Sequence, residues 1–381
     1  MRIALVDYIA WDYTIDTAYC APLGGSQSAL CYLAEELAKG GHEVFLLNRC
    51  RRGCNSRGVR VMPLDVANAE LLRSLDVVIV QNRAAGGVEL RPLLRGDARL
   101  ILWTQHAHDQ PAVQSLCRPE IRQAYDAFVL VSLWQQEQYR LRFDLDPLRC
   151  RLMRNAVAPA FAGLFTPGQC VLKEKTSPPV SAYTSTPYRG LDILVAVFPM
   201  IRAAVPGATL RVYSSMQVYQ HSAEQDETKF GELYRRCQQT EGIEYVGSVP
   251  QPELARQLQS VSLLAYPNHF PETSCIAVSE AMAAGCRVVT SRLGALPETT
   301  AGFARLVPVT DNWNDYARAF VAEVVDVLRP DADQAVVEDR LAEQVAYVNR
   351  HYAWPARAAE WTGWLAELTC GAGTRAAARI S

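Results

Sequence analysis

Short apolar runs alternate along the chain with amphipathic stretches of helical length. The runs are rich in β-branched residues and fall into two sets, separated near residue 165. They are 3–6, 44–47, 77–80, 100–103 and 128–131, then 180–183, 210–213, 263–266, 288–290 and 306–309. Such near-continuous apolar strands are typical of parallel sheets covered by helices on both faces. The pattern predicts an α/β protein in which the same arrangement occurs twice.

The segment between the two sets, residues 158–179, has the composition of an interdomain linker. It is rich in proline and glycine and carries a charged Lys-Glu-Lys run. We therefore expect one domain over 1–165 and a second over 176–351. Beyond residue 330 the pattern becomes helical, with expected helices at 335–350 and 355–368.

Composition and charge narrow the class of protein. The 381 residues carry 38 basic and 40 acidic side chains, a net charge of -2 that argues against a nucleic-acid binder. The 11 cysteines are odd in number and scattered, as expected of free thiols in a reducing compartment. The first apolar run is too short for a signal peptide, and no stretch is long enough to span a membrane. We expect a cytoplasmic protein.

Gly24 and Gly25 precede an expected helix at 28–39. Glycines at a helix N-terminus let a ligand approach free backbone amides, which favours phosphate. A simple turn with a helix cap is the equally weighted alternative. The segment lacks the G-x-G-x-x-G pattern of dinucleotide folds, which argues against a nicotinamide enzyme.

A second polar segment follows a buried strand directly and contains His106, His108 and Asp109. In open parallel sheets, ligands bind beyond the carboxyl ends of strands. These groups could orient a sugar, transfer protons or bind a metal, and an exposed loop is the plain alternative. No second ligand cluster is evident, and the triplets 144–146 and 331–333, each Asp-x-Asp, are interpreted as turns beside prolines. We therefore predict no metal site.

The most specific segment is 270–290, which predicts a loop, a helix at about 274–284, a glycine stop and a strand. Glu272 stands just before the helix and Glu280 about two turns along it, up to ~12 Å away. Two carboxylates so placed suit the two ends of a nucleotide sugar, with the diphosphate at the helix N-terminus between them. The alternative is that both are ordinary helix charges. Glu280 lies among small residues, which argues against a purely solvated role.

These residues resemble those of the retaining glycosyltransferases of family 4. The similarity covers the Gly-Gly loop, the Gly-His-Glu-Val run at 41–44, Arg154-Asn155-Ala156-Val157, the Glu pair seven residues apart, and Leu293–Glu298. The resemblance implies the GT-B fold, with two Rossmann-like parallel-sheet domains facing a central cleft. It also implies that a C-terminal helix over 352–381 crosses back to the N-terminal, acceptor-side domain.

The resemblance also implies roles for individual residues. Glu272 and His106 are expected at the reacting sugar, and Glu280 at the ribose diol. Arg189, which takes the place of the family's usual lysine, is expected to bind the diphosphate. The remaining expected substrate contacts are Gly24, Gly25, His108, Asp109, Thr273, Ser274 and Cys275.

Two features depart from the family's pattern. The family has a second cation five or six residues before the lysine position, where this chain has Tyr183, Thr184 and Ser185. The residues after Glu272 are Thr-Ser-Cys rather than the more usual Gly-Phe-Gly. These changes suggest either a subgroup that uses another donor or weakened catalysis.

The function implied is metal-independent, retaining transfer of a hexose from a nucleotide-diphosphate sugar to a glycan or glycolipid, in bacterial surface polysaccharide or glycoconjugate synthesis. No cofactor is expected. The alternatives are a non-catalytic nucleotide-sugar-binding protein and a sugar-nucleotide epimerase. A lipid-linked acceptor would bring the protein to the inner face of a membrane. The arginines that could meet acidic headgroups there, or simply form a solvated loop, are Arg49, Arg51, Arg52, Arg57 and Arg60.

Overall fold

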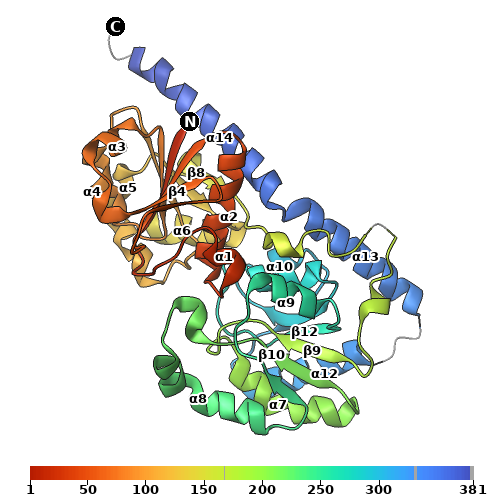
Figure 1. Ribbon diagram of the computed structural model, residues 1–381. Helices are drawn as coiled ribbons and strands as arrows, with labels where there is room; N and C mark the ends of the chain where they lie inside the picture. The colour runs from red at the N-terminus through yellow and green to blue at the C-terminus, as the bar shows by residue number, and fades with distance from the viewer. Residues whose placement is uncertain (167, 330–332, 378–381) are drawn as a thin grey trace. The chain divides into compact units, whose positions relative to one another are not determined.

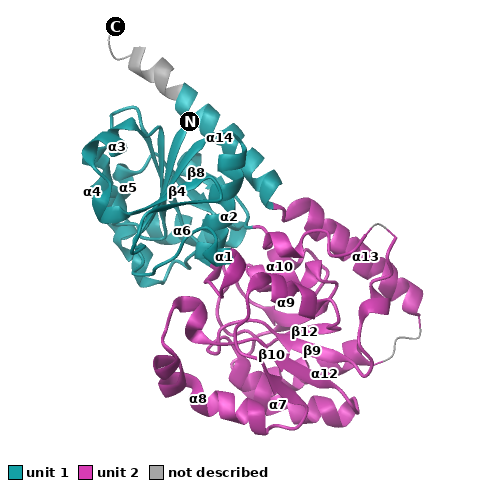
Figure 2. Cartoon of the chain, viewed as in Figure 1, with its two compact units in different colours: residues 1–18, 26–155, 354–381 teal, residues 19–25, 156–353 magenta. Residues whose placement is uncertain are grey.

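The chain folds into two compact α/β units (Figure 2). A computed structural model describes residues 1–166, 168–329 and 333–377, with side chains described to residue 370. The first unit comprises residues 1–18, 26–155 and those from 354 onward, and the second comprises 19–25 and 156–353. Within the described residues, no helix is both long and apolar enough to cross a membrane.

The first unit is built on an eight-stranded sheet with the order β3-β4-β2-β1-β5-β6-β7-β8 (Figure 1). Every pair of neighbouring strands is parallel except β3 and β4. The strands are β1 (Arg2–Asp7), β2 (Glu43–Asn48), β3 (Cys54–Ser56), β4 (Val59–Pro63), β5 (Val77–Gln81), β6 (Arg99–Trp103), β7 (Ala127–Leu130) and β8 (Cys150–Leu152).

Helices cover both faces of this sheet, as the apolar strands predict. On one face, Val78, Leu100 and Phe128 of the strands pack against side chains of the covering helices, such as Leu72, Ile121 and Phe143, and form one buried cluster. The helices of the unit are α2 (Gly25–Lys39), α3 (Ala69–Ser74), α4 (Gly86–Leu90), α5 (Pro119–Ala124), α6 (Leu133–Phe143) and α14 (Trp354–Ala377). The short α1 (Thr17–Cys20) is divided between the two units after Ala18.

The C-terminal helix α14 packs on the first unit. The indole of Trp361 lies edge-on to Trp103 of β6, with 5.4 Å between ring centroids, and both side chains are buried. Thr362 Oγ1 lies 3.2 Å from His42 Nε2, and Arg99 donates to the Leu368 carbonyl. These contacts explain why a segment that follows the second unit in the sequence belongs to the first unit.

The second unit has a six-stranded parallel sheet with the order β11-β10-β9-β12-β13-β14. Figure 1 shows α9 and α10 on one side of this sheet and α7 and α12 on the other. The strands are β9 (Val180–Tyr183), β10 (Thr209–Val212), β11 (Ile243–Tyr245), β12 (Leu263–Tyr266), β13 (Arg287–Arg292) and β14 (Arg305–Pro308). The helices are α7 (Leu191–Ala204), α8 (Ala223–Gln239), α9 (Gln251–Leu258), α10 (Ile276–Ala283), α11 (Leu296–Thr300), α12 (Trp313–Leu328) and α13 (Gln334–His351).

The predicted two-sheet α/β fold is confirmed, but the expected linker is part of the second unit. Glu338 of α13 accepts hydrogen bonds from the backbone amides of Val171 and Leu172. Lys175 donates to two carbonyls of the same unit, those of Gln259 and Ala284. In the sequence, the boundary between the two units falls after residue 155, ten residues before the expected boundary at 165. The second unit runs from 156 rather than 176. Residues 19–25, expected in the first domain, also group with the second unit.

The two expected turns at the Asp-x-Asp triplets have different outcomes. Asp144 ends α6 with a left-handed φ of 51°, and the Asp146 carboxylate accepts the amide of Leu148. Both are therefore turn residues, as predicted. In the other triplet, 331 and 332 lie outside the described residues.

Candidate active site

The strand order of the second unit reverses between β9 and β12. The chain runs from β9 outward to β10 and β11, then returns to the other side of β9 as β12. At such a switch point the two following loops diverge, which leaves room for a ligand at the carboxyl ends of the strands. The loop after β9 carries Arg189, and the loop after β12 carries Glu272.

Arg189 and Glu272 form an ion pair at this edge. Arg189 Nη1 lies 2.6 Å from Glu272 Oε1, and Tyr266 OH donates to the same oxygen at 2.7 Å. The Glu272 side chain is 6% exposed and that of Arg189 is 19% exposed. One carboxylate oxygen is thus held by two donors, which fixes the orientation of the other.

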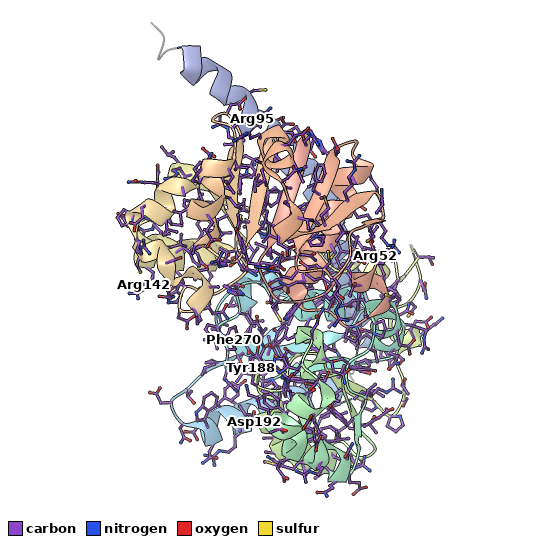
Figure 3. All side chains as sticks on the ribbon, turned by 60° about the vertical axis from the view of Figure 1, so that its left-hand side comes forward. Arg52, Arg95, Arg142, Tyr188, Asp192 and Phe270 are labelled. Atoms are coloured by element: carbon purple, nitrogen blue, oxygen red, sulfur yellow. The ribbon has the colours of Figure 1, made fainter. Side chains whose placement is uncertain are left out.

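Aromatic rings surround the Arg189 guanidinium. Its Cζ lies 4.6 Å from the ring centroid of Phe270 and 5.6 Å from that of Tyr188, and Figure 3 labels both aromatic residues. Burial acts to lower the pKa of Arg189, but the charge of Glu272 and the neighbouring tyrosines outweigh it, so the pKa is raised well above its ordinary value. Arg189 is therefore a permanent cation close to two aromatic rings.

Several donors of the same loop are buried without a partner. Arg189 Nε and the hydroxyls of Thr184 and Thr186 have no hydrogen-bond partner among the described residues. Buried polar groups in proteins are almost always paired, so such a set indicates a place where a ligand or water supplies acceptors. The sequence gives no signal for the two threonines beyond their place after a strand.

Two glycines allow the loops to approach one another closely. Gly190 has a φ of 103°, and a Cβ there would lie 2.1 Å from the Pro267 carbonyl oxygen. A Cβ at Gly294 would lie 2.5 Å from the backbone carbonyl oxygen of Glu272, and the amide of the following residue, Ala295, donates to that oxygen at 2.7 Å. Both positions require a residue with no side chain. The Leu293–Glu298 segment therefore holds the backbone of Glu272.

Helix α10 begins at Ile276, two residues later than expected, and its N-cap Cys275 makes no side-chain capping bond. Thr273 and Cys275 are buried and Ser274 is half-buried. A Cβ at Gly25 would lie 3.5 Å from Ile276 Cδ1, so the glycine loop adjoins this helix start, with Gly24 buried and Gly25 exposed. Uncapped amides at a helix N-terminus attract anions.

Glu280 is buried within α10, with 4% of its surface exposed. Its Oε1 accepts the amide of Ala158 at 3.2 Å. Burial raises the pKa of Glu280 to about 7, and the hydrogen bonds from Ala158 and Gln251 offset part of this effect. A carboxyl group with this pKa changes charge near neutral pH.

The histidine segment lies in the first unit, in the loop that follows β6. The His106 carbonyl accepts from Gln135 Nε2 at 2.8 Å and from Tyr139 OH at 2.9 Å. The His108 ring lies edge-on to Trp134, with 6.3 Å between centroids. Both histidines are half-buried and Asp109 is exposed. Of the predicted site residues, these three lie together in one unit and the other eight lie in the second.

A pocket of about 470 Å³ lies away from these residues, at the amino ends of β9, β10 and β11. Its lining includes Arg211 and Glu244, which pair with each other at 3.1 Å. Ligands of parallel sheets bind at the carboxyl edge, so this pocket is not the candidate site.

Three of the five arginines proposed for membrane contact have acidic partners. Arg51 pairs with Asp12, Arg57 with Asp16 and Glu35, and Arg60 with Glu43. Arg52, labelled in Figure 3, is exposed. Paired arginines attract acidic headgroups less strongly, which favours the alternative of a solvated loop.

Comparisons with known proteins agree with the fold. The model of the family described as glycosyl transferases group 1 matches residues 180–328, and no curated protein matches the chain. Sucrose-phosphate synthase from Thermosynechococcus elongatus is 18% identical, with a TM-score of 0.67 over 97% of this chain and 100% of that one.

Two further solved structures are similar. Anabaena HepE, solved in complex with UDP and glucose, is 13% identical with a TM-score of 0.67, over 96% of this chain and 100% of that one. WaaG, a glycosyltransferase involved in lipopolysaccharide biosynthesis, is 14% identical with a TM-score of 0.62, over 94% and 98%. The chain thus has the fold of the GT-B glycosyltransferases, and its residues 180–328 match the model of the group 1 glycosyltransferases.

Proposed function

We propose that the protein transfers a hexose from a nucleotide-diphosphate sugar to a glycan or glycolipid acceptor, with retention of anomeric configuration and without a metal or other cofactor. The ion pair of Arg189 and Glu272 at the switch point of the second unit carries this proposal. The group 1 match over 180–328 supports it, because that range contains both residues.

The donor diphosphate is bound by the loop after β9. Arg189 supplies the positive charge, and its free Nε and the unpaired hydroxyls of Thr184 and Thr186 supply further donors. These hydroxyls take the place of the second cation expected in the family. The uncapped start of α10 adds backbone amides. Glu272 contacts the sugar hydroxyls and Glu280 the ribose diol, since carboxylates accept from vicinal hydroxyls.

Transfer breaks the bond between the anomeric carbon and the diphosphate oxygen and forms one to the acceptor oxygen on the same face. The leaving diphosphate takes the acceptor's proton, so the products are the glycosylated acceptor and a nucleoside diphosphate. Arg189 stabilises the charge that develops on the leaving group, a contribution on the order of 3 kcal/mol for one such donor. His106 lies beside the sugar, and the first unit binds the acceptor.

The surface-polysaccharide role is part of the same proposal. WaaG acts in lipopolysaccharide biosynthesis and HepE was solved with UDP and glucose. In this proposal the protein is a cytoplasmic enzyme that uses a lipid-linked acceptor at the inner face of the membrane.

The test begins with thermal unfolding against UDP, GDP, ADP and CMP and their common sugar conjugates. A ligand at about 100 times its dissociation constant adds about 2.7 kcal/mol of stability. One nucleotide is expected to stabilise the wild type and fail to stabilise Arg189→Met. Arg211→Met is the matched control, because it removes an arginine paired with a glutamate at the opposite edge of the same sheet.

The stabilising donor is then supplied with glycan and lipid-linked acceptors, and release of nucleoside diphosphate is measured. The second candidate function, binding without transfer, is favoured by the absence of a second cation at 183–185. It predicts that a nucleotide stabilises the protein but that no nucleoside diphosphate is released from the donor with any acceptor. No stabilisation by any compound of the panel would count against both.

A further inference from the structure

Gln135 connects two loops of the first unit through every polar atom of its side chain. It lies in the first turn of α6 and is fully buried. Its Oε1 accepts the Val131 amide at 2.7 Å. Its Nε2 donates to the carbonyls of Thr104 at 3.1 Å and His106 at 2.8 Å. The end of β7 is thereby joined to the loop after β6.

Tyr139, one turn further along α6, holds the same loop. Its hydroxyl donates to the His106 carbonyl at 2.9 Å and lies 3.2 Å from Thr104 Oγ1. Thr104 Oγ1 in turn accepts the His106 amide at 3.2 Å. The Tyr139 proton is used on His106, so Thr104 is the donor in their shared contact. The peptide groups on both sides of the His106 Cα are therefore fixed.

The geometry requires a carboxamide at position 135. One acceptor and two donors in a single plane match one amide and two carbonyls. A glutamate could accept from Val131 but would present negative oxygens to both carbonyls. The Ser132-x-x-Gln135 spacing is that of a capping box, in which the glutamine would return to the Ser132 amide. Here its side chain is used on Val131 and on the histidine loop instead.

We propose that Gln135 is a positioning residue for His106. It fixes the backbone of His106, so that the imidazole is presented from one place at the end of β6. The catalytic consequence rests on the proposed function, in which His106 lies beside the donor sugar. Because the second unit binds the donor, loss of Gln135 is expected to lower kcat while leaving the donor KM nearly unchanged.

The experiment compares Gln135→Glu and Tyr139→Phe with a matched control, Gln344→Glu. Gln344 is also buried and also donates to two carbonyls, those of Met282 and Cys286, but in the second unit. NMR spectra of the six histidine rings are recorded, and the His106 signals are assigned as those lost in His106→Gln. Activity is measured with the donor found by thermal unfolding.

We expect the His106 ring signals to move in Gln135→Glu, to move less in Tyr139→Phe, and to stay in place in Gln344→Glu. The kcat of Gln135→Glu is expected to fall on the order of 100-fold, the cost of a displaced group in an active site. Gln344→Glu lowers the unfolding temperature without the shift, which separates positioning from general destabilisation.

Unmoved His106 signals in folded Gln135→Glu would overturn the proposal, as would an unchanged kcat. If Gln135→Glu does not fold, Tyr139→Phe decides, because it removes only one donor to the same carbonyl and unmoved signals there are equally damaging. Moved signals in a protein that transfers no sugar support the hold of Gln135 on His106 and count against the proposed function alone.

Discussion

Arg189 Nη1 and Glu272 Oε1 lie 2.6 Å apart, although their residues are 83 positions apart in the sequence. The pair joins the loops after β9 and β12 at the point where the sheet order reverses. Glu272 is nearly buried, so neither charge has full access to water. A buried pair of this kind costs free energy when one partner is lost, because the other charge is left uncompensated.

A double-mutant cycle measures how strongly these two charges are coupled. We expect Arg189→Met and Glu272→Gln each to lower the free energy of unfolding by about 2 kcal/mol or more, with a coupling energy above about 1 kcal/mol. The same cycle on Arg211 and Glu244, which are 30% and 65% exposed, should give a coupling energy of about 0.5 kcal/mol or less. Equal coupling energies in the two cycles, measured by urea unfolding, would contradict this assignment.

Gly294 is predicted to be irreplaceable for a reason beyond its backbone angle. Its φ is 58°, and a Cβ would lie 2.5 Å from the backbone carbonyl oxygen of Glu272. Gly294→Ala should therefore displace Glu272 and weaken nucleotide-sugar binding about tenfold or more, in addition to lowering stability.

Gly302→Ala is the matched control for this effect. Gly302 has a φ of 84°, but among the described residues no atom beyond its chain neighbours lies within 4 Å of a Cβ placed there. This variant has the same kind of backbone strain, about 1–2 kcal/mol, without the clash. Calorimetric titration of both variants should show weaker binding only for Gly294→Ala. Equal affinities would mean that Gly294 does not hold Glu272.

The sequence predicted the central strands well and the edge strands poorly. All ten apolar runs became strands, nine of them central and the tenth, β14, at a sheet edge. Central parallel strands are buried on both faces and contain few polar residues, so their signal is strong. The missed strands β3, β4, β8 and β11 lie at or next to sheet edges, and each includes polar residues such as Arg60 and Glu244. Their signal is therefore weak in a single sequence.

The residues of the candidate site divide in the same way, into those that lie within one short motif and those that only the fold brings together. Glu272 and Glu280 could be chosen because their spacing lies within one short motif. Tyr266 and Gln135 could not, because each acts through a partner brought near by the fold, although the Ser132-x-x-Gln135 spacing was visible. The linker was misassigned for the same reason, since its anchor, Glu338, lies more than 160 residues away.

Lys175 is predicted to be a major stabilising residue of the segment once expected to be a linker. Its Nζ donates at 2.8 Å to the carbonyls of Gln259 and Ala284, the C-cap residues of α9 and α10. Burial lowers its pKa. Lys175→Met keeps the apolar stem but leaves two carbonyls without their donor, which should cost about 2–4 kcal/mol. The exposed Lys173→Met should cost less than about 0.5 kcal/mol. Similar urea midpoints for the two variants would refute this role.

The raised pKa of Glu280 predicts that the free energy of unfolding depends on pH in a specific way. Burial raises its pKa in the folded chain to about 7, from an ordinary 4.5. Between these values the folded chain keeps a proton that the unfolded chain has released. The contribution of Glu280 to the free energy of unfolding therefore falls as the pH rises from about 4.5 to about 7, and is constant above that. The full change is on the order of 3 kcal/mol.

Glu280→Gln removes this titration and keeps an oxygen that can accept the Ala158 amide. The variant should therefore gain stability relative to the wild type as the pH rises, with most of the gain between pH 5 and 7. Glu241→Gln, at a side chain that is 85% exposed, should show a difference from the wild type that hardly changes with pH. Guanidinium unfolding at pH 5, 6, 7 and 8 gives all three curves. A Glu280→Gln difference that stays constant from pH 5 to 8 would show that this carboxyl group does not titrate near neutrality, so that any ribose diol would meet the same carboxylate at every pH tested.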